Sequence, residues 1–510
     1  MSARGGDGLG GDSHDDGRGG GGPRGGGRGG GGRASAGRPT GRSSDESWSG
    51  ERAERHLRSL ELFGMRFGLD RMRRMMTVLG SPQRRFRAVH VVGTNGKTST
   101  TRMVAAILER HGLRTGAYLS PHLISYAERV QVAERDLSGP AFAAAVARAA
   151  WAAERVNRTL AEDDHVTQFE LLTAAALWAL AEREVEVAVV EAGLGGRYDA
   201  TAVVESAVTV LTNVGLEHTR WLGPTVRDIA TEKLAVLRPG TALALGADLD
   251  SEALAVAGAV AGEQRARIVQ VSPEEVAAAP PAPIFQQRNF ALARVAAEAY
   301  LADAGIAVRE EAVREAALAT DVPGRLQVVA DDPLTVLDAA HNPDAARALV
   351  ESLPALLVGR RLADPIWCQP AHEREGGFDP QLAHVVEGGS NPQLALVMGV
   401  LEDKDAASML SELLPLCARA WFTAPPSSRA LSPAALQSLA RQQGFEHTAC
   451  EPHPRRALEQ AREWARAQPG ATAVLATGSV YLVGDLLACF AERAAALGDV
   501  AATGAAEGRA

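Results

Sequence analysis

The chain has 510 residues, of which 46% are hydrophobic and 23% charged, and its formal net charge is −9. Such values are typical of a globular protein with two or three domains, and the acidic balance argues against a general nucleic-acid binder. No apolar segment is long enough to cross a bilayer, the start of the chain has no apolar signal core, and the four widely spread cysteines lack metal-ligand spacing, so a cytoplasmic location with free thiols is expected.

Residues 1–50 are dominated by Gly, Arg, Ser and Asp. This composition buries too little apolar surface to offset the chain entropy, so the segment is predicted to be a disordered tail. Its arginines would allow contact with RNA or anionic surfaces, but a solvated tail is the favoured interpretation. Residues 51–76 then supply apolar positions at helical spacing, which predicts a largely helical segment.

A phosphate-binding loop is predicted after an apolar strand over residues 88–92, with a helix over 103–113 following it. The loop and its flank are Gly93, Thr94, Asn95, Gly96, Lys97, Thr98 and Ser99. The glycines allow backbone amides to face phosphate oxygens, Lys97 adds a positive charge, and Thr98 offers a hydroxyl to phosphate or Mg²⁺. The glycine spacing is two residues shorter than in the commonest pattern, and a plain Gly turn is the alternative. The Lys-Thr pair between a strand and a helix favours nucleotide binding.

The next units alternate between strand and helix. A strand over 116–119 ends at Ser120, helices are predicted over 142–156 and 168–181, and a buried strand over 185–191 ends at Glu191 before a glycine-rich loop. An acidic residue at the carboxyl end of a buried strand is well placed to hold Mg²⁺, although a surface acid that caps a turn fits the local sequence equally well. Ser120 could reach the same sheet edge, or belong to a simple turn.

A further strand over 207–213 leads to Glu217 and His218, and a helix over 226–237 carries Lys233. By spacing alone neither His218 nor Lys233 stands out, because a lone histidine or a helical lysine is usually an ordinary polar residue. An apolar helix over 289–304 follows a proline-rich loop. The alternation predicts an α/β domain with a mostly parallel sheet over residues 51–322.

A second, smaller, Rossmann-like α/β domain is predicted over residues 323–497. Its strands are expected over 335–337, 394–398, 420–423 and 473–476, and its helices over 344–353, 406–414, 433–443, 454–467 and 484–497. Asp338, His341 and Asn342 follow its first strand, which suggests a ligand-facing loop, an N-cap by Asn342, or both. Residues 359–393 are interpreted as a surface insertion, and residues 498–510 as a flexible tail.

The order of these motifs resembles that of the folylpolyglutamate synthase / dihydrofolate synthase family, a branch of the Mur ligase superfamily. The matching pieces, spread over about residues 55–495, are GTNGK (93–97), SPHL (120–123), ER (128–129), FE (169–170), EAGLGGRYDAT (191–201), TNVGLEH (212–218), EK (232–233), PGR (323–325), DAAHNP (338–343), DKD (403–405) and GSVYLVG (478–484). Each piece is modest, but their joint order is specific.

The resemblance implies roles for matching positions. Lys97 and the loop amides would hold the ATP phosphates, Ser120 and Glu191 would ligate a first Mg²⁺, and His218 a second. Lys233 matches the lysine that the family carbamylates, which turns a base into an acidic metal ligand. Further contacts to the nucleotide, from the helix over 289–304 and from the second domain, would come from Asn289, Arg325, Asp338 and His341. L-Glutamate would sit between the domains, and a monomer is expected from the same resemblance.

The reaction that the resemblance implies is ATP-dependent amide formation, in which the γ-phosphoryl group activates a carboxylate and the amine of L-glutamate displaces phosphate. The acceptor would be dihydropteroate, a reduced folate, or both, and the sequence does not choose between them. Thr98 stands where the family often has Gly, as in peptidoglycan Mur ligases, and Ala202 replaces the usual Asn. A Mur-type ligase of a peptidoglycan precursor and a non-catalytic nucleotide-binding regulator are therefore the alternatives.

Overall fold

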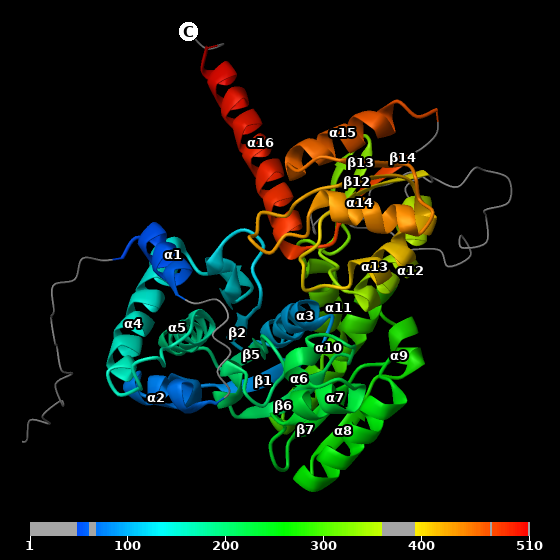
Figure 1. Cartoon of the computed structure of the whole chain (residues 1–510). Helices are drawn as coiled ribbons and strands as arrows, with labels where there is room; N and C mark the ends of the chain where they lie inside the picture. The colour runs from blue at the N-terminus through cyan, green and yellow to red at the C-terminus, as the bar shows by residue number, and fades with distance from the viewer. Residues whose placement is uncertain (1–47, 61–67, 360–392, 470–471, 508–510) are drawn as a thin grey trace, which may run out of the picture. The chain divides into compact units, whose positions relative to one another are not determined.

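The computed structural model describes residues 48–60, 68–359, 393–469 and 472–507, and these described residues belong to one compact unit (Figure 1). The expected tail up to residue 47 and the expected insertion, apart from its ends, lie outside the described residues. Among the described helices, none is long and apolar enough to span a membrane.

The first sheet is mostly parallel. Within the described residues its strand order is β4 (Arg135–Asp136), β3 (Val130–Val132), β2 (Thr115–Tyr118), β5 (Val187–Glu191), β1 (Arg87–Val92), β6 (Ser206–Leu211), β7 (Ala242–Leu245) and β8 (Arg267–Gln270). Strands β2, β5, β1, β6, β7 and β8 are parallel, and only β3 and β4 at one edge run antiparallel. Because β1 lies between β5 and β6, the loop after β1 emerges at the centre of the carboxyl edge, where ligands bind in such sheets.

Helices cover both faces of this sheet. Successive side chains along a strand point to opposite faces, and in the buried strands both sets enter a hydrophobic core. The cores place α3, α10 and α11 on one face and α4, α5, α7 and α8 on the other. The helices are α1 (Gly50–Ser59), α2 (Asp70–Val78), α3 (Lys97–Arg110), α4 (Gly139–Asn157), α5 (Gln168–Glu182), α6 (Thr219–Leu222), α7 (Val226–Leu234), α8 (Ser251–Gln264), α9 (Pro273–Ala277), α10 (Ile284–Asp303) and α11 (Glu310–Ala319), with 3₁₀ turns η1 (Pro82–Arg84), η2 (Tyr126–Arg129) and η3 (Ala200–Val203).

The second sheet is smaller and again mostly parallel. Its order is β13 (Thr448–Cys450), β12 (Cys417–Phe422), β11 (Gln393–Met398), β14 (Thr472–Thr477), β10 (Leu334–Leu337) and β9 (Gln327–Asp331), with only β9 antiparallel. Its helices are α12 (Pro343–Gly359), α13 (Ala406–Leu413), α14 (Pro433–Gln442), α15 (Pro454–Arg466) and α16 (Val480–Glu507), and a 3₁₀ turn η6 (Leu414–Leu416) follows α13. Helices α12, α13 and α14 pack on one face, and α15 and α16 on the other. The α/β prediction is therefore confirmed.

Some boundaries differ from the predictions. Helix α3 begins at Lys97 rather than near residue 103 and ends at Arg110, because Gly96 and Gly112 adopt the left-handed conformation at its two ends. The predicted helix over 51–76 is represented by α1 and α2, with residues 61–67 outside the description. Residues 498–507 were expected to form a flexible tail, but their secondary structure is the end of α16, in keeping with their alanine content.

Candidate active site

The loop between β1 and α3 is held by its own chain and by the neighbouring strand. The Nζ of Lys97 donates hydrogen bonds to the carbonyls of Gly93 (3.1 Å) and Thr94 (2.9 Å). From the end of β6, the Oδ1 of Asn213 accepts from the Asn95 amide at 2.8 Å, and the Oγ1 of Thr212 donates to the Asn95 carbonyl at 2.6 Å. These contacts preform the loop at the N-terminus of α3, which is a favourable place for an anion.

Two glycines are required where the loop approaches its neighbours. Gly93 has φ +149°, and a Cβ there would lie 1.8 Å from the Oγ1 of Thr212. Gly96 has φ +79°, and a Cβ there would lie 2.3 Å from the Oδ1 of Asn289 in α10. The backbone conformation and the close contacts both explain why this loop needs glycine.

Glu191 ends β5 on the face that carries α3, and its side chain is buried. Its carboxylate accepts from the Oγ1 of Thr98 (2.9 and 3.0 Å) and from the Ser120 amide (3.0 Å). Burial raises its pKa to about 7, although Lys97 and these hydrogen bonds oppose the shift. Glu191 and Thr98 thus present oxygen atoms together, which is the ligand chemistry that Mg²⁺ prefers, and the backbone of Ser120 lies beside them.

Lys233 reaches the same loop from α7. Its Nζ donates to the Gly93 carbonyl at 2.7 Å, and its side chain is buried. Burial lowers its pKa to about 7, with Lys97 acting in the same direction. A substantial fraction of this amine is therefore neutral near pH 7, which gives it a nucleophilic lone pair.

The glycine-rich loop after β5 is fixed by Asp199. The amide of Leu194 donates to Asp199 Oδ2 (2.7 Å), and Asp199 Oδ1 accepts from the Thr201 amide (3.0 Å) and from its hydroxyl. Gly196 packs so closely on α7 that a Cβ would lie 2.4 Å from the carbonyl of Lys233. This loop therefore sets the position of the lysine.

A charged cluster joins the loop after β6 to the second sheet. The Oε1 of Glu217 lies 2.7 Å from Lys404 Nζ, 3.6 Å from His341 Nε2 and 3.7 Å from His218 Nε2. Burial alone would raise the pKa of Glu217, but His341 and Lys404 outweigh it, so the pKa lies well below its usual range. Burial lowers the pKa of His218 to about 4, which leaves its imidazole neutral at pH 7.

The loop after β10 contributes from the second sheet. The side-chain amides of Asn342 and Asn95 exchange hydrogen bonds (2.9 and 3.2 Å), and Asn342 Oδ1 also accepts from the Ala345 amide at 2.8 Å. The predicted cap of α12 is thus confirmed, together with a contact to the phosphate loop. Asp338 is buried and accepts from two backbone amides; burial raises its pKa, and Arg325 opposes that shift.

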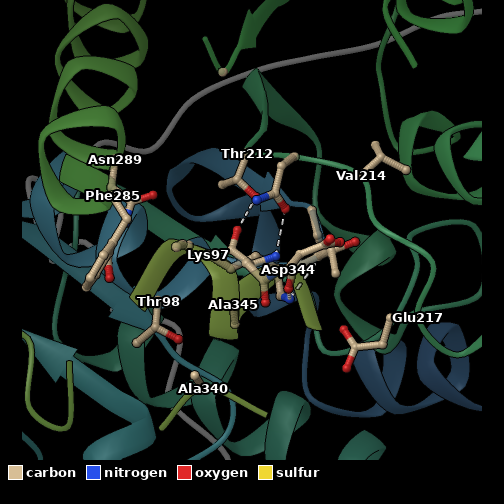
Figure 2. A pocket seen from close by; sticks show the side chains of 18 of the residues that line it. Lys97, Thr98, Thr212, Val214, Glu217, Phe285, Asn289, Ala340, Asp344 and Ala345 are labelled. Carbon is tan, nitrogen blue, oxygen red and sulfur yellow. Dashed lines mark hydrogen bonds between the residues drawn. The ribbon is translucent and has the colours of Figure 1, made fainter. Parts of the chain in front are cut away.

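Most of these groups line one cavity of about 830 Å³. Figure 2 shows Lys97 and Thr98 at the start of α3, Thr212 after β6, Phe285 and Asn289 of α10, Ala340 of the loop after β10, and Asp344 and Ala345 at the start of α12. Every residue predicted to bind the nucleotide or a metal lies in its wall: Gly93, Thr94, Asn95, Gly96, Lys97, Thr98, Ser99, Ser120, Glu191, His218, Lys233, Asn289, Arg325, Asp338 and His341. Their individual roles stay predictions.

The four predicted metal ligands, Ser120, Glu191, His218 and Lys233, share this cavity wall. In the described part of the chain, no group of three or more His, Cys, Asp or Glu side chains is placed to hold a metal. The predicted set contains only one carboxylate and one imidazole, so it would depend on nucleotide phosphates, on hydroxyls or on a modified lysine for further ligands.

The sequence did not predict that Glu217, Lys404 and Asn342 join the two sheets, or that Asn213 holds the phosphate loop. The motifs that contain them were visible, but their contacts join residues that are far apart in the chain: Lys404 and Glu217 are separated by 187 positions. His122, in the motif after β2, is engaged elsewhere, since its Nδ1 accepts from Arg129 Nε at 3.0 Å.

Comparison with known proteins gives a consistent result. Residues 91–279 match the Mur ligase middle domain family. The chain is 31% identical to the folylpolyglutamate synthase of Lacticaseibacillus casei over 397 residues, which cover 72% of this chain and 84% of that protein. It is 32% identical to the dihydrofolate synthase/folylpolyglutamate synthase of Escherichia coli over 334 residues, or 62% of this chain and 74% of that protein.

Solved structures agree. The Mycobacterium tuberculosis folylpolyglutamate synthase complexed with ADP is similar with a TM-score of 0.74 at 29% identity, over 86% of this chain and 98% of that chain. Escherichia coli FolC in complex with DHPP and ADP is similar with a TM-score of 0.71 at 28% identity, over 87% of this chain and 98% of that chain. A bifunctional folylpolyglutamate synthase/dihydrofolate synthase with Mn, AMPPNP and L-glutamate bound is similar with a TM-score of 0.68 at 26% identity, over 86% of this chain and 98% of that chain.

Proposed function

Because the chain belongs to the folylpolyglutamate synthase / dihydrofolate synthase family, we propose that it is an ATP-dependent ligase that adds L-glutamate to dihydropteroate, to the γ-carboxylate of reduced folates, or to both. The observation that carries the proposal is the single cavity in which the phosphate loop faces Glu191, Lys233 and the second-sheet loop. The relatives reported above, 31 and 32% identical, support the same activity.

The chemistry follows from the poor reactivity of a carboxylate. Transfer of the γ-phosphoryl group of ATP to an acceptor carboxylate oxygen gives an acyl phosphate and ADP. The amine of L-glutamate then attacks the acyl carbon, loses a proton, and expels phosphate as the amide forms. Lys97 and the amides of the β1–α3 loop would hold the phosphates, and Asn289, Arg325, Asp338 and His341 would contact the rest of the nucleotide.

A divalent cation fits beside the oxygen atoms of Glu191 and Thr98, and would supply charge neutralisation at the phosphates. A complex of a related synthase with Mn and AMPPNP supports this expectation. We propose Ser120 and Glu191 as ligands of a first ion, and His218 with modified Lys233 as ligands of a second.

Carbamylation of Lys233 is proposed on chemical grounds. Carbamate formation requires a neutral amine, which attacks CO₂ and loses a proton. The lowered pKa of Lys233 supplies that form, and the hydrogen-bond partner of its Nζ among the described residues is the Gly93 carbonyl at 2.7 Å. The product would be an anionic ligand on a long arm beside the phosphates. Mass spectrometry under CO₂, with Lys233→Met as the control, would detect the added group.

The alternatives receive less support. The similar proteins named above are synthases of this family, and none is a peptidoglycan-precursor ligase. A non-catalytic regulator would be expected to lack some of Lys97, Glu191, His218 and Lys233, whereas all are present in one cavity. We expect a cytoplasmic monomer, which sedimentation analysis of the purified chain can check.

The direct test measures phosphate release from Mg-ATP and L-glutamate, with dihydropteroate in one reaction and a reduced folate in the other. Release with dihydropteroate alone identifies a dihydrofolate synthase, release with folate alone a folylpolyglutamate synthase, and release with both a bifunctional enzyme. A folded, ATP-binding protein that releases no phosphate in either reaction would contradict the proposal.

A further inference from the structure

A second large cavity, of about 770 Å³, lies at the opposite edge of the first sheet, by the amino ends of β1 and β6. It is lined by Arg73 of α2, Arg84 of η1, Arg87 of β1 and Arg238 after α7. Its hydroxyl-bearing residues are Thr77, Ser81 and Ser206, and its acidic one is the exposed Glu205. The active-site chemistry described above uses none of these residues.

The arginines of this cavity differ in whether other side chains already bind them. Arg87 forms an ion pair with Asp303 and covers the ring of Tyr300. Arg73 and Arg84 are exposed, and neither has an ion-pair partner among the described residues. Two uncompensated guanidinium groups at one cavity attract a ligand with more than one negative charge.

The inner end of the cavity leaves hydrogen-bonding capacity unused. The Nη2 of Arg238 donates hydrogen bonds to the carbonyls of Ala202 (2.7 Å) and Val204 (3.3 Å). The buried Nε of Arg238 has no hydrogen-bond partner in the described structure. The buried Oε1 of Gln83 also has none. Since buried polar atoms are normally satisfied, an unused donor on a cationic side chain points to a ligand oxygen or a water at this end.

The cavity is connected to the active site through η3. Arg238 holds the carbonyls of this turn, and Thr201 within it contacts both buried His90 (2.8 Å) and Asp199. Asp199 in turn fixes the Leu194 amide of the glycine loop at 2.7 Å. A ligand that shifts Arg238 would therefore act on the loop that positions Lys233.

We propose that this arginine cavity binds a small multivalent oxyanion, either phosphorylated or polycarboxylated, and that its occupancy changes nucleotide affinity through η3 and Asp199. The phosphate and carboxylate sources share the chemistry that guanidinium groups recognise. The site would serve as an effector site, separate from the reacting groups.

The binding test uses calorimetric titration of inorganic phosphate, and separately of tricarballylate, into the full chain saturated with AMPPNP and Mg²⁺ at fixed ionic strength. The test variant is Arg73→Gln/Arg84→Gln. The matched control is Arg74→Gln/Arg85→Gln, which removes the same charge from adjacent exposed positions outside the cavity. We expect affinity to fall at least about tenfold in the test variant and less than about twofold in the control.

Binding of only one probe would identify the ligand as a phosphate or as a carboxylate. Absence of binding by wild type, or equal loss in both variants, would overturn the site. For the coupling, AMPPNP affinity is measured with and without the bound anion. A change on the order of fivefold is expected in wild type and none in the test variant; an unchanged affinity in wild type would overturn the effector role. Both readouts use binding alone, so they can fail independently of ligase activity.

Discussion

Glu191 and Lys233 are the two residues on which the proposed chemistry most depends, and burial moves both toward neutrality at pH 7. The pKa of Glu191 is raised to about 7 and that of Lys233 is lowered to about 7. Burial is the larger cause in each case, because a charged side chain loses its hydration. A bound cation would lower the pKa of Glu191 and favour the charged carboxylate, so the charge of the site should change when the metal nucleotide binds.

Replacement of Glu191 by Gln keeps the shape of the side chain and removes its charge. We expect kcat to fall about 100-fold or more because the oxygen ligand opposite the phosphate loop is weakened. The fold should persist, since the change removes a buried ionisable group. Phosphate release and thermal unfolding measure these effects, with exposed Glu182→Gln as the control. Activity near that of wild type would remove Glu191 from the mechanism.

The lowered pKa of Lys233 predicts how the stability of the fold depends on pH. In the unfolded chain Lys233 has an ordinary pKa of about 10.5, while the folded value is about 7, so between these pH values the unfolded state binds more protons. The free energy of unfolding should therefore gain a contribution that rises with pH from about 7 to about 10.5. Below pH 7 both states are protonated, and the cost of burying the charge is present in full.

Urea unfolding of wild type and of Lys233→Met at several pH values within that window tests this linkage. The difference in unfolding free energy between the two proteins should change in favour of wild type as the pH rises. A difference that is independent of pH would mean that Lys233 has an ordinary pKa in the folded protein.

Among the helices, strands and loops, those that could be predicted are marked by residues close together in the sequence. The loop after β1 and Glu191 at the end of β5 were placed correctly, because glycines and an acidic residue directly follow apolar runs. Strands β3, β4, β7, β8, β9 and β13 were not predicted, since each is short and a short run carries little periodicity. The Glu217–Lys404 contact and the pKa values could not be predicted, because both depend on which distant elements become neighbours.

The loop after β1 can be tested as an element. In Gly93→Ala the new Cβ would collide with Thr212 and the backbone would be strained, so ADP affinity should fall at least about tenfold. Gly258→Ala is the control: it lies in α8 with open space around it, and it should stabilise the protein by about 1 kcal/mol without changing ADP binding. Calorimetric ADP titration distinguishes the two, and unchanged affinity in Gly93→Ala would contradict the assigned loop.

At the scale of the whole molecule, function requires residues from both sheets. The Asn95–Asn342 amide pair and the Glu217–Lys404 ion pair connect the phosphate loop and the loop after β6 to the second sheet. Such contacts fix the distance between the groups proposed to hold the phosphates and the groups proposed to contact the rest of the nucleotide. Changes at this junction should therefore affect catalysis as well as stability.

Lys404→Met would leave Glu217 without its nearest cation, at 2.7 Å. We expect kcat/KM for ATP to fall about tenfold, and the unfolding free energy to fall on the order of 2 kcal/mol, less than for a fully buried pair. Lys404→Arg should retain most activity, and exposed Glu402→Gln should behave as wild type. If Lys404→Met keeps normal kcat/KM, the ion pair has no part in joining the two halves of the site.

Activation of a carboxylate as an acyl phosphate before glutamate attacks has a direct isotopic test. The acceptor that supports phosphate release is labelled with ¹⁸O in its reacting carboxyl group, and the products of one turnover are analysed by mass spectrometry. We expect one ¹⁸O atom in the released phosphate for each amide bond formed, because the bridging oxygen of the acyl phosphate leaves with the phosphate. Amide formation with unlabelled phosphate, or phosphate release without glutamate in the product, would contradict it.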